Sequence, residues 1–146
     1  MLDSPDARRL ITALDTELKA LFPEAGATHF SLSQEQVAVG DGAFLVAYVD
    51  GEAVGCGAVR RLDSSTAEIK RMYVATPFRG RGVGRAIVTA LEGEARRLGV
   101  SRVVLETGSR LPVAIRLYRS MGYTPIPVFG EYLASPETSR CFGKHL

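Results

Sequence analysis

The chain has 146 residues, the size of one domain, and its 46% hydrophobic and 23% charged residues exclude a disordered or fibrous protein. No apolar run approaches the ~20 residues of a membrane span, and the first residues lack the layout of a signal peptide. We therefore expect a cytoplasmic globular domain with free thiols at Cys56 and Cys141. His29 and His145 are isolated, so no metal site is predicted.

The net charge of +2 hides an uneven distribution of charged side chains. Residues 1–59 carry 3 basic and 9 acidic side chains, whereas residues 60–119 carry 13 basic and 5 acidic ones. A basic middle favours an anionic ligand in that part of the chain. A coding bias is the alternative, because 15 of the 18 cations are arginine.

The first predicted element is an amphipathic helix over residues 6–21, with Ser4 as its N-cap and Pro5 at its first position. Residues 24–41 are expected to form a loop with a short helix near 33–37. Two strands, 43–49 and 53–60, flank a hairpin turn at 50–52. A third strand is predicted over residues 68–74.

In the second half of the chain, helices and strands alternate. The predicted elements are a helix over 83–98, a buried strand over 102–107, a helix over 113–121 and strands near 126–129 and 139–143. An antiparallel group of three strands followed by helix, strand, helix and two strands predicts a single α/β domain with a mixed sheet.

The segment RGRGVGR, at residues 79–85 between a strand and a helix, carries the clearest chemical signal. Glycines at alternate positions allow the backbone to curl, so that successive amides converge at the helix N-terminus, where the helix dipole favours an anion. Three arginines add positive charge. The segment therefore predicts a site for a phosphate or pyrophosphate. A flexible loop is the alternative, but glycines in a first helical turn cost about 1 kcal/mol each relative to alanine.

Two known glycine-rich phosphate motifs can be compared with this segment. The dinucleotide motif G-x-G-x-x-G fails, because the sixth position is Arg85 counted from Gly80 and Ile87 counted from Gly82. Glu106, at the end of the next strand, imitates the acid that binds ribose in such proteins, so this alternative stays open. The pattern R/Q-x-x-G-x-G/A is satisfied by residues 79–84.

With this pattern the chain resembles the GNAT family of N-acetyltransferases, which move an acetyl group from acetyl-CoA to an amine. Further matches are the strand EIKRMYV at 68–74, the strand VVLET at 103–107, and AIRLY at 114–118 followed by MGY at 121–123. The resemblance covers residues 43–146 and is greatest to small bacterial members. It implies the acyl-CoA N-acyltransferase fold, in which a mixed sheet flanked by helices splays at its centre. Residues 1–42 would form the acceptor side, and 43–146 the acetyl-CoA-binding core.

The resemblance also implies the roles of individual residues. Glu68 matches a general base, which an alkylamine needs because it is protonated at neutral pH, and Tyr118 matches the tyrosine that protonates the departing CoA thiolate. Backbone groups of the preceding strand would pair with the pantetheine arm, and loop amides would hold the pyrophosphate. The implied cofactor-binding residues are Met72, Tyr73, Val74, Arg79, Gly80, Arg81, Gly82, Val83, Gly84 and Arg85.

Other roles remain open for these residues. Glu68 could be a strand glutamate paired with a neighbouring cation, which would make Glu106 the base, and Tyr118 could be a core tyrosine. Leu111 stands where many family members have an asparagine that contacts the cofactor, so Ser109 or Arg110 would have to replace that contact.

The predicted function is transfer of the acetyl group to a primary amine of a small molecule by direct attack in a ternary complex, without a metal. The alternative is a non-catalytic sensor or regulatory module that binds CoA or a nucleotide. Neither nucleic acid nor membrane is an expected partner, and a homodimer paired through apolar C-terminal strands is possible. Four cations near the acceptor end would favour an amine that also bears a carboxylate: Arg60, Arg61, Lys70 and Arg71.

Overall fold

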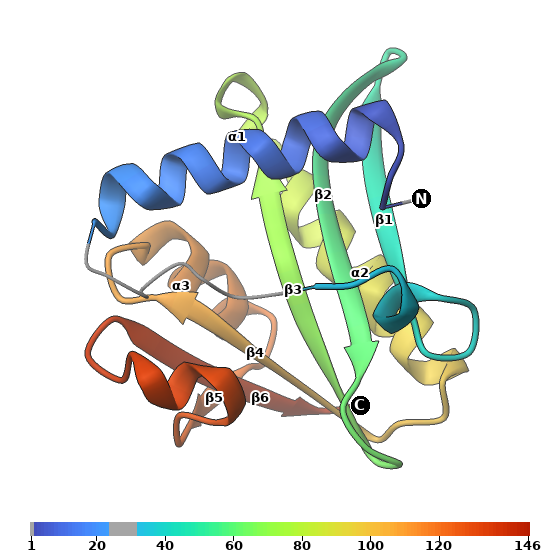
Figure 1. Cartoon of the computed structure of the whole chain (residues 1–146), viewed down its shortest axis with the longest axis vertical. Helices are drawn as coiled ribbons and strands as arrows, with labels where there is room; N and C mark the ends of the chain where they lie inside the picture. Colours follow the sequence, from blue (N-terminus) through green and yellow to red (C-terminus); the bar gives the residue numbers. More distant parts are fainter. Residues whose placement is uncertain (1, 24–31) are drawn as a thin grey trace.

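A computed structural model describes residues 2–23 and 32–146. Figure 1 shows the resulting α/β domain, in which a six-stranded sheet carries helices on both faces. The helices are α1 (Pro5–Leu21), α2 (Val83–Arg97) and α3 (Pro112–Ser120), and the short 3-10 helices are η1 (Glu35–Val37), η2 (Thr76–Phe78) and η3 (Gly130–Ala134). The strands are β1 (Gly42–Val49), β2 (Glu52–Arg61), β3 (Thr66–Val74), β4 (Arg102–Gly108), β5 (Thr124–Ile126) and β6 (Ser139–His145).

Local sequence signals explain where the first elements begin and turn. The side chain of Ser4 accepts a hydrogen bond of 3.1 Å from the Ala7 amide, so the predicted N-cap of α1 is confirmed. The hairpin between β1 and β2 turns at Asp50 and Gly51, which both have a positive φ, the conformation that a two-residue hairpin turn requires.

The sheet has the strand order β1-β2-β3-β4-β6-β5 and is mostly antiparallel. Only β3 and β4 are parallel, and their register runs from Thr66 opposite Arg102 to Ile69 opposite Leu105. Beyond that point β3 continues to Val74 and β4 to Gly108 without pairing to each other. The two strands therefore form a fork, and the predicted mixed, centrally splayed sheet is confirmed.

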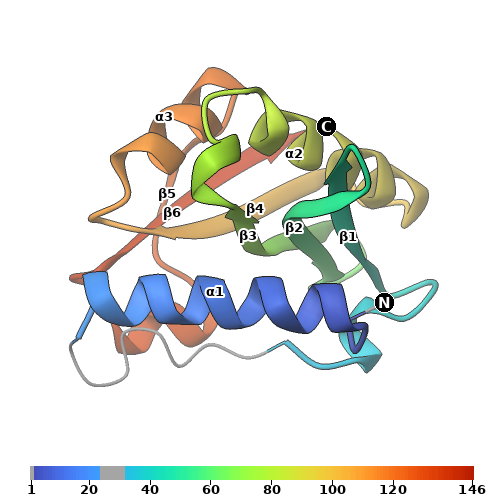
Figure 2. The ribbon, with the colours of Figure 1, turned by 90° about the horizontal axis from the view of Figure 1, so that it is seen from above.

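The helices divide between the two faces of the sheet, as Figure 2 shows: α2 and α3 lie on one face, and α1 lies on the other with η3. The larger core packs Ile87, Val88 and Leu91 of α2 against strand residues such as Ile69 and Val103. A smaller core under α1 contains Leu10, Ala53 and Cys56, with Tyr73 packed against it. Burial of these apolar faces holds each helix on its own side of the fork.

The end of the chain differs from the sequence prediction. β5 covers Thr124–Ile126 rather than 126–129, and β6 lies inside the sheet between β4 and β5. β6 pairs with β4 on one side and with β5 on the other, so β5 forms an edge of the sheet, and the pairing of two subunits through the C-terminal strands stays a prediction. No helix among the described residues is long and apolar enough to cross a membrane. Most of the loop predicted over 24–41, with His29, lies outside the described residues.

Candidate active site

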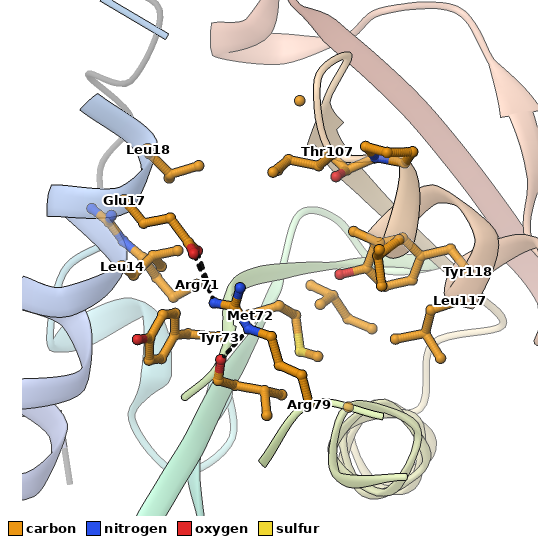
Figure 3. A pocket seen from close by; sticks show the side chains of 18 of the residues that line it. Leu14, Glu17, Leu18, Arg71, Met72, Tyr73, Arg79, Thr107, Leu117 and Tyr118 are labelled. Atoms are coloured by element: carbon orange, nitrogen blue, oxygen red, sulfur yellow. Dashed lines mark hydrogen bonds and ion pairs between the residues drawn. The ribbon is translucent and has the colours of Figure 1, made fainter. Parts of the chain in front are cut away.

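A cavity of about 790 Å³ opens at the fork between β3 and β4, and Figure 3 shows its lining side chains. Its walls come from both faces of the sheet, since α1 and η3 contribute residues as well as α2 and α3. The divergence of the two strands therefore creates one continuous space where a paired sheet would separate the two faces. We call the side bounded by α2 and α3 the loop side, and the side bounded by α1 and η3 the acceptor side.

The loop side begins at the predicted phosphate loop. Gly80 and Gly82 have φ values of +79° and +82°, and a Cβ at either position would meet nothing within 4 Å. Glycine is therefore required at these two positions by the left-handed backbone conformation and not by lack of space for a side chain. Gly82 caps α2 without a side-chain hydrogen bond, and the first turn of α2 contains no acidic residue. This helix N-terminus suits an anion, because its first amides have no acceptor within the helix.

The arginines of the loop differ in their surroundings. Arg79 and Arg85 line the cavity, whereas Arg81 does not line it and lies over the ring of Phe78 at 5.3 Å. The Arg79 guanidinium donates hydrogen bonds of 2.8 and 3.0 Å to the Glu17 carboxylate on α1. Arg85 donates to the Ser120 hydroxyl at 2.7 Å. Two of the three predicted loop cations thus lie where an anion in the cavity could contact them.

All three predicted pantetheine-binding residues of β3, namely Met72, Tyr73 and Val74, line the cavity. They lie beyond the last β3–β4 pair, so the edge of β3 that faces β4 is open to a ligand there. The Val74 carbonyl already accepts a hydrogen bond of 2.8 Å from Arg79 Nε. The backbone N–H and C=O groups that remain for hydrogen bonds to such a ligand are therefore mainly those of Met72 and Tyr73.

Tyr118 enters the loop side from α3. Its side chain is only 4% exposed, and its ring meets that of Tyr123 edge to face at a centroid distance of 5.9 Å. Figure 3 shows its hydroxyl facing the cavity. Burial, followed by the charge of Glu106, raises the pKa of the Tyr118 phenol, so the group carries its proton at neutral pH.

Glu68, the first choice for a general base, lies outside the cavity lining. Its side chain is fully buried in the paired part of β3, opposite Val104. One carboxylate oxygen accepts a hydrogen bond of 3.0 Å from Arg60 Nε and forms an ion pair of 2.9 Å with the same guanidinium, and the other oxygen accepts a hydrogen bond of 2.5 Å from the Tyr132 hydroxyl. Glu68 is therefore enclosed by donors and does not line the cavity, and its role as base stays a prediction.

Glu106, the alternative base, is the first residue of β4 beyond the fork and lines the cavity. Burial raises its pKa to about 7, and a hydrogen bond from Ser139 partly offsets this. Lys70 also lowers the pKa, whereas the carboxylates of Glu68 and Glu131 raise it. Its pKa therefore lies close to neutral pH, where a carboxylate is an effective proton acceptor.

Two features of the site were not foreseen from the sequence. Tyr132, on η3, reaches the cavity from a segment 64 positions after its partner Glu68. Three leucines of α1 line the acceptor side: Leu14, Leu18 and Leu21. Helical periodicity placed them on the apolar face of this helix, but it did not indicate that the face reaches the site.

Leu111 lines the cavity as the N-cap residue of α3 and makes no side-chain cap hydrogen bond, so it does not replace an asparagine amide.

Comparisons with known proteins agree with this geometry. The family model "Acetyltransferase (GNAT) family" matches residues 8–123. An IAA acetyltransferase of Azospirillum brasilense is 39% identical over 129 residues, which cover 88% of this chain and 83% of the relative. A crystal structure from Klebsiella pneumoniae, assigned to the acyl-CoA N-acyltransferases, superposes with a TM-score of 0.84 and 30% identity, covering 99% of this chain and 92% of that one.

A more distant structure shares the fold. A GNAT family acetyltransferase from Elizabethkingia anophelis, solved with acetyl-CoA bound, has a TM-score of 0.61 and 20% identity over 78% of this chain and 84% of its own. The family match covers most of the chain. The chain belongs to the GNAT family and is an acetyltransferase.

Proposed function

We propose that the protein transfers the acetyl group of acetyl-CoA to a primary amine of a small molecule by direct attack within a ternary complex. One observation carries the proposal: the glycine loop, Tyr118 and Glu106 all line a single cavity that joins the two faces of the sheet. Acetyl-CoA would enter from the loop side and the amine from the acceptor side, so that the two meet at the fork.

The residues on the loop side fit a CoA molecule. The amides of residues 80–85, together with Arg79 and Arg85, would hold the pyrophosphate, because backbone donors and positive charge converge there. The open edge at Met72 and Tyr73 would hydrogen-bond the pantetheine arm as an added strand does. Arg81, which lies over Phe78, would act only through its charge and its backbone amide.

Two side chains at the fork, Glu106 and Tyr118, would carry out the proton transfers of the reaction. Glu106 would take one proton from the acceptor ammonium, directly or through a water, and leave a neutral amine. The amine nitrogen would form a bond to the acetyl carbon as the carbon–sulfur bond breaks. Tyr118 would then give its proton to the CoA sulfur, and the second proton of the attacking nitrogen would pass, directly or through a water, to the Tyr118 phenolate. The products would be an acetamide and free CoA, and the Glu106 carboxyl would release its proton to solvent. A carboxyl with a pKa of about 7 and a phenol that stays protonated are suited to these opposite roles.

Thermal unfolding with acetyl-CoA, CoA, NADH and NADPH tests the proposed donor. A ligand at one hundred times its Kd adds about 2.7 kcal/mol, which raises the Tm of a domain of this size by several degrees. We expect this shift with acetyl-CoA and CoA, whereas a shift with the nicotinamide cofactors alone would contradict the proposal.

A second measurement separates an enzyme from a non-catalytic sensor. Tyr118→Phe should leave the acetyl-CoA shift unchanged and lower kcat by about 10²-fold. Acetyl-CoA binding without acetylation of any amine would favour the sensor.

A further inference from the structure

An irregularity in β3 places two cations on the same face of the sheet. From Cys56, opposite Tyr73, to Ala58, opposite Lys70, β2 advances two residues while β3 advances three. The extra residue forms a β-bulge at Arg71, whose φ of +57° is unusual for a residue other than glycine. Adjacent side chains of a regular strand point to opposite faces, so the bulge changes which face Arg71 occupies.

As a result, Lys70 and Arg71 both face the acceptor side. The Lys70 ammonium lies 2.7 Å from the Glu131 carboxylate on η3, and the Arg71 guanidinium lies 2.8 Å from the Asp15 carboxylate on α1. Both cations line the cavity, whereas their two carboxylate partners do not. The partners thus orient the cations from behind, and the cavity wall itself presents positive charge.

The other charged groups on this side leave that positive charge dominant. Arg110 also lines the cavity, and its guanidinium donates to the Leu21 carbonyl at 2.9 Å. Two carboxyls line the cavity: the Glu17 carboxylate on α1 accepts two hydrogen bonds from the Arg79 guanidinium, and Glu106 has a raised pKa that keeps it largely uncharged below about pH 7. Among the other cations suggested by the sequence, Arg60 binds Glu68, and Arg61 donates to the Leu98 carbonyl at 2.6 Å. Neither of these two lines the cavity.

The opposite wall of the acceptor side is apolar apart from Glu17, whose carboxylate is paired with Arg79. Leu14, Leu18 and Leu21 lie along one face of α1 and line the cavity, as Figure 3 shows for the first two. An acceptor that fills this space therefore meets a proton-accepting carboxyl, a pair of cations and a row of leucines.

We propose that the acceptor is a small amine that also carries a carboxylate and an apolar substituent, as apolar amino acids do, and that Arg71 with Lys70 binds the carboxylate. This inference rests on the proposed function. A guanidinium has five N–H donors in a planar arrangement that matches a carboxylate, so Arg71 can bind the acceptor while it keeps its contact with Asp15. The ammonium end would lie toward Glu106 and the apolar group against α1.

Pairs of amines that differ only by a carboxylate test the inference. We would measure CoA release with phenylalanine against 2-phenylethylamine, with leucine against 3-methylbutylamine, and with putrescine. The wild type should favour the carboxylated member of each pair by at least tenfold in kcat/KM. Arg71→Gln should lower that ratio to near one, and Arg71→Lys should restore part of it.

Asp15→Asn is the matched control, because it breaks the same ion pair and leaves the Arg71 charge in place. It should keep the preference, as should Arg61→Gln, which removes a cation outside the cavity. An equal loss of the preference in Asp15→Asn and Arg71→Gln would show that the preference depends on the ion pair between Arg71 and Asp15 and not on the Arg71 charge itself. That result would overturn the inference. Preference of the wild type for the uncarboxylated amines would overturn it too while leaving the proposed function intact. If acetyl-CoA binds and no amine is acetylated, the proposed function itself fails.

Discussion

At the scale of single residues, the site is defined by the different surroundings of two glutamates on adjacent strands. Glu68 is fully buried and accepts hydrogen bonds from Arg60 and Tyr132. Glu106, beyond the end of the strand pairing, lines the cavity and has a pKa raised to about 7. The same residue type is therefore enclosed by donors in the paired sheet and lines the cavity at the fork.

Glu106→Gln should lower kcat/KM by about 10²- to 10⁴-fold, because the variant lacks the group that accepts the ammonium proton. In the wild type, kcat/KM should rise with pH through about 7 as the Glu106 carboxyl loses its proton, and the variant should lack this limb. The check is a pH–rate profile with one acceptor amine, accompanied by the acetyl-CoA Tm shift, which should persist. A variant that keeps both its rate and its pH limb would exclude Glu106 as the base.

Glu68→Gln should act on stability first. The change removes the buried carboxylate that lies 2.9 Å from the partly buried Arg60 guanidinium and leaves Arg60 only the Glu131 carboxylate at 4.0 Å, which we expect to cost about 2 kcal/mol in the free energy of unfolding. Urea unfolding measures the loss, and the activity of the folded fraction should stay within tenfold of the wild type. A loss of activity as large as that of Glu106→Gln, in a variant of normal stability, would return the role of base to Glu68.

At the scale of elements, two glycines that flank α2 separate the effect of backbone conformation from that of the proposed ligand binding. Gly82, before the first turn of α2, and Gly99, after its last turn, have φ values of +82° and +81°, and a Cβ at either position would meet nothing within 4 Å. The two positions therefore carry nearly the same backbone penalty for a side chain, but only Gly82 lines the cavity.

Gly82→Ala and Gly99→Ala should each lower the free energy of unfolding by about 1 to 2 kcal/mol, because alanine is strained at a positive φ. Only Gly82→Ala should also weaken acetyl-CoA binding, since its methyl group lies where the pyrophosphate would approach the loop amides. Calorimetric titration of both variants with acetyl-CoA compares the two effects. Equal affinities would mean that the phosphates do not bind at this loop.

At the scale of the whole molecule, placing a carboxyl at an opening in the sheet has a cost in stability. The folded state raises the Glu106 pKa from 4.5 to about 7, so between these values the folded chain holds a proton that the unfolded chain has lost. The contribution of this group to stability therefore falls as the pH rises from about 4.5 to about 7, by on the order of 3 kcal/mol for a shift of this size.

Glu106→Gln should remove this pH dependence, because its amide does not titrate. Relative to the wild type, the variant should become more stable as the pH rises from 5 to 8, in urea unfolding followed at each pH. A difference between the two proteins that does not change with pH would contradict the raised pKa. In that case, the pH limb of activity would have to come from another group.

Much of the architecture was predictable because it follows from short-range patterns. The periodicity of apolar residues predicted α1, α2 and the strands from β1 to β4 to within about two residues at each end, as the structure confirms. The segment at 79–85, together with the motifs that follow it, indicated the family, because backbone conformation, dipole and charge are all local there. β5 begins two residues and ends three residues before the predicted strand, because a three-residue strand containing Pro125 has almost no periodicity.

The amino-acid sequence by itself thus determined the elements, their order, the glycine loop and the family. Only the tertiary structure distinguished the surroundings of Glu68 from those of Glu106, since these depend on the register at which β3 and β4 cease to pair. It also placed Tyr132 against Glu68, and Lys70 and Arg71 on one face. The physical reason is range: helix and strand propensities act over a few neighbours, whereas the protonation state and exposure of a side chain depend on groups that are distant in sequence and adjacent only after folding.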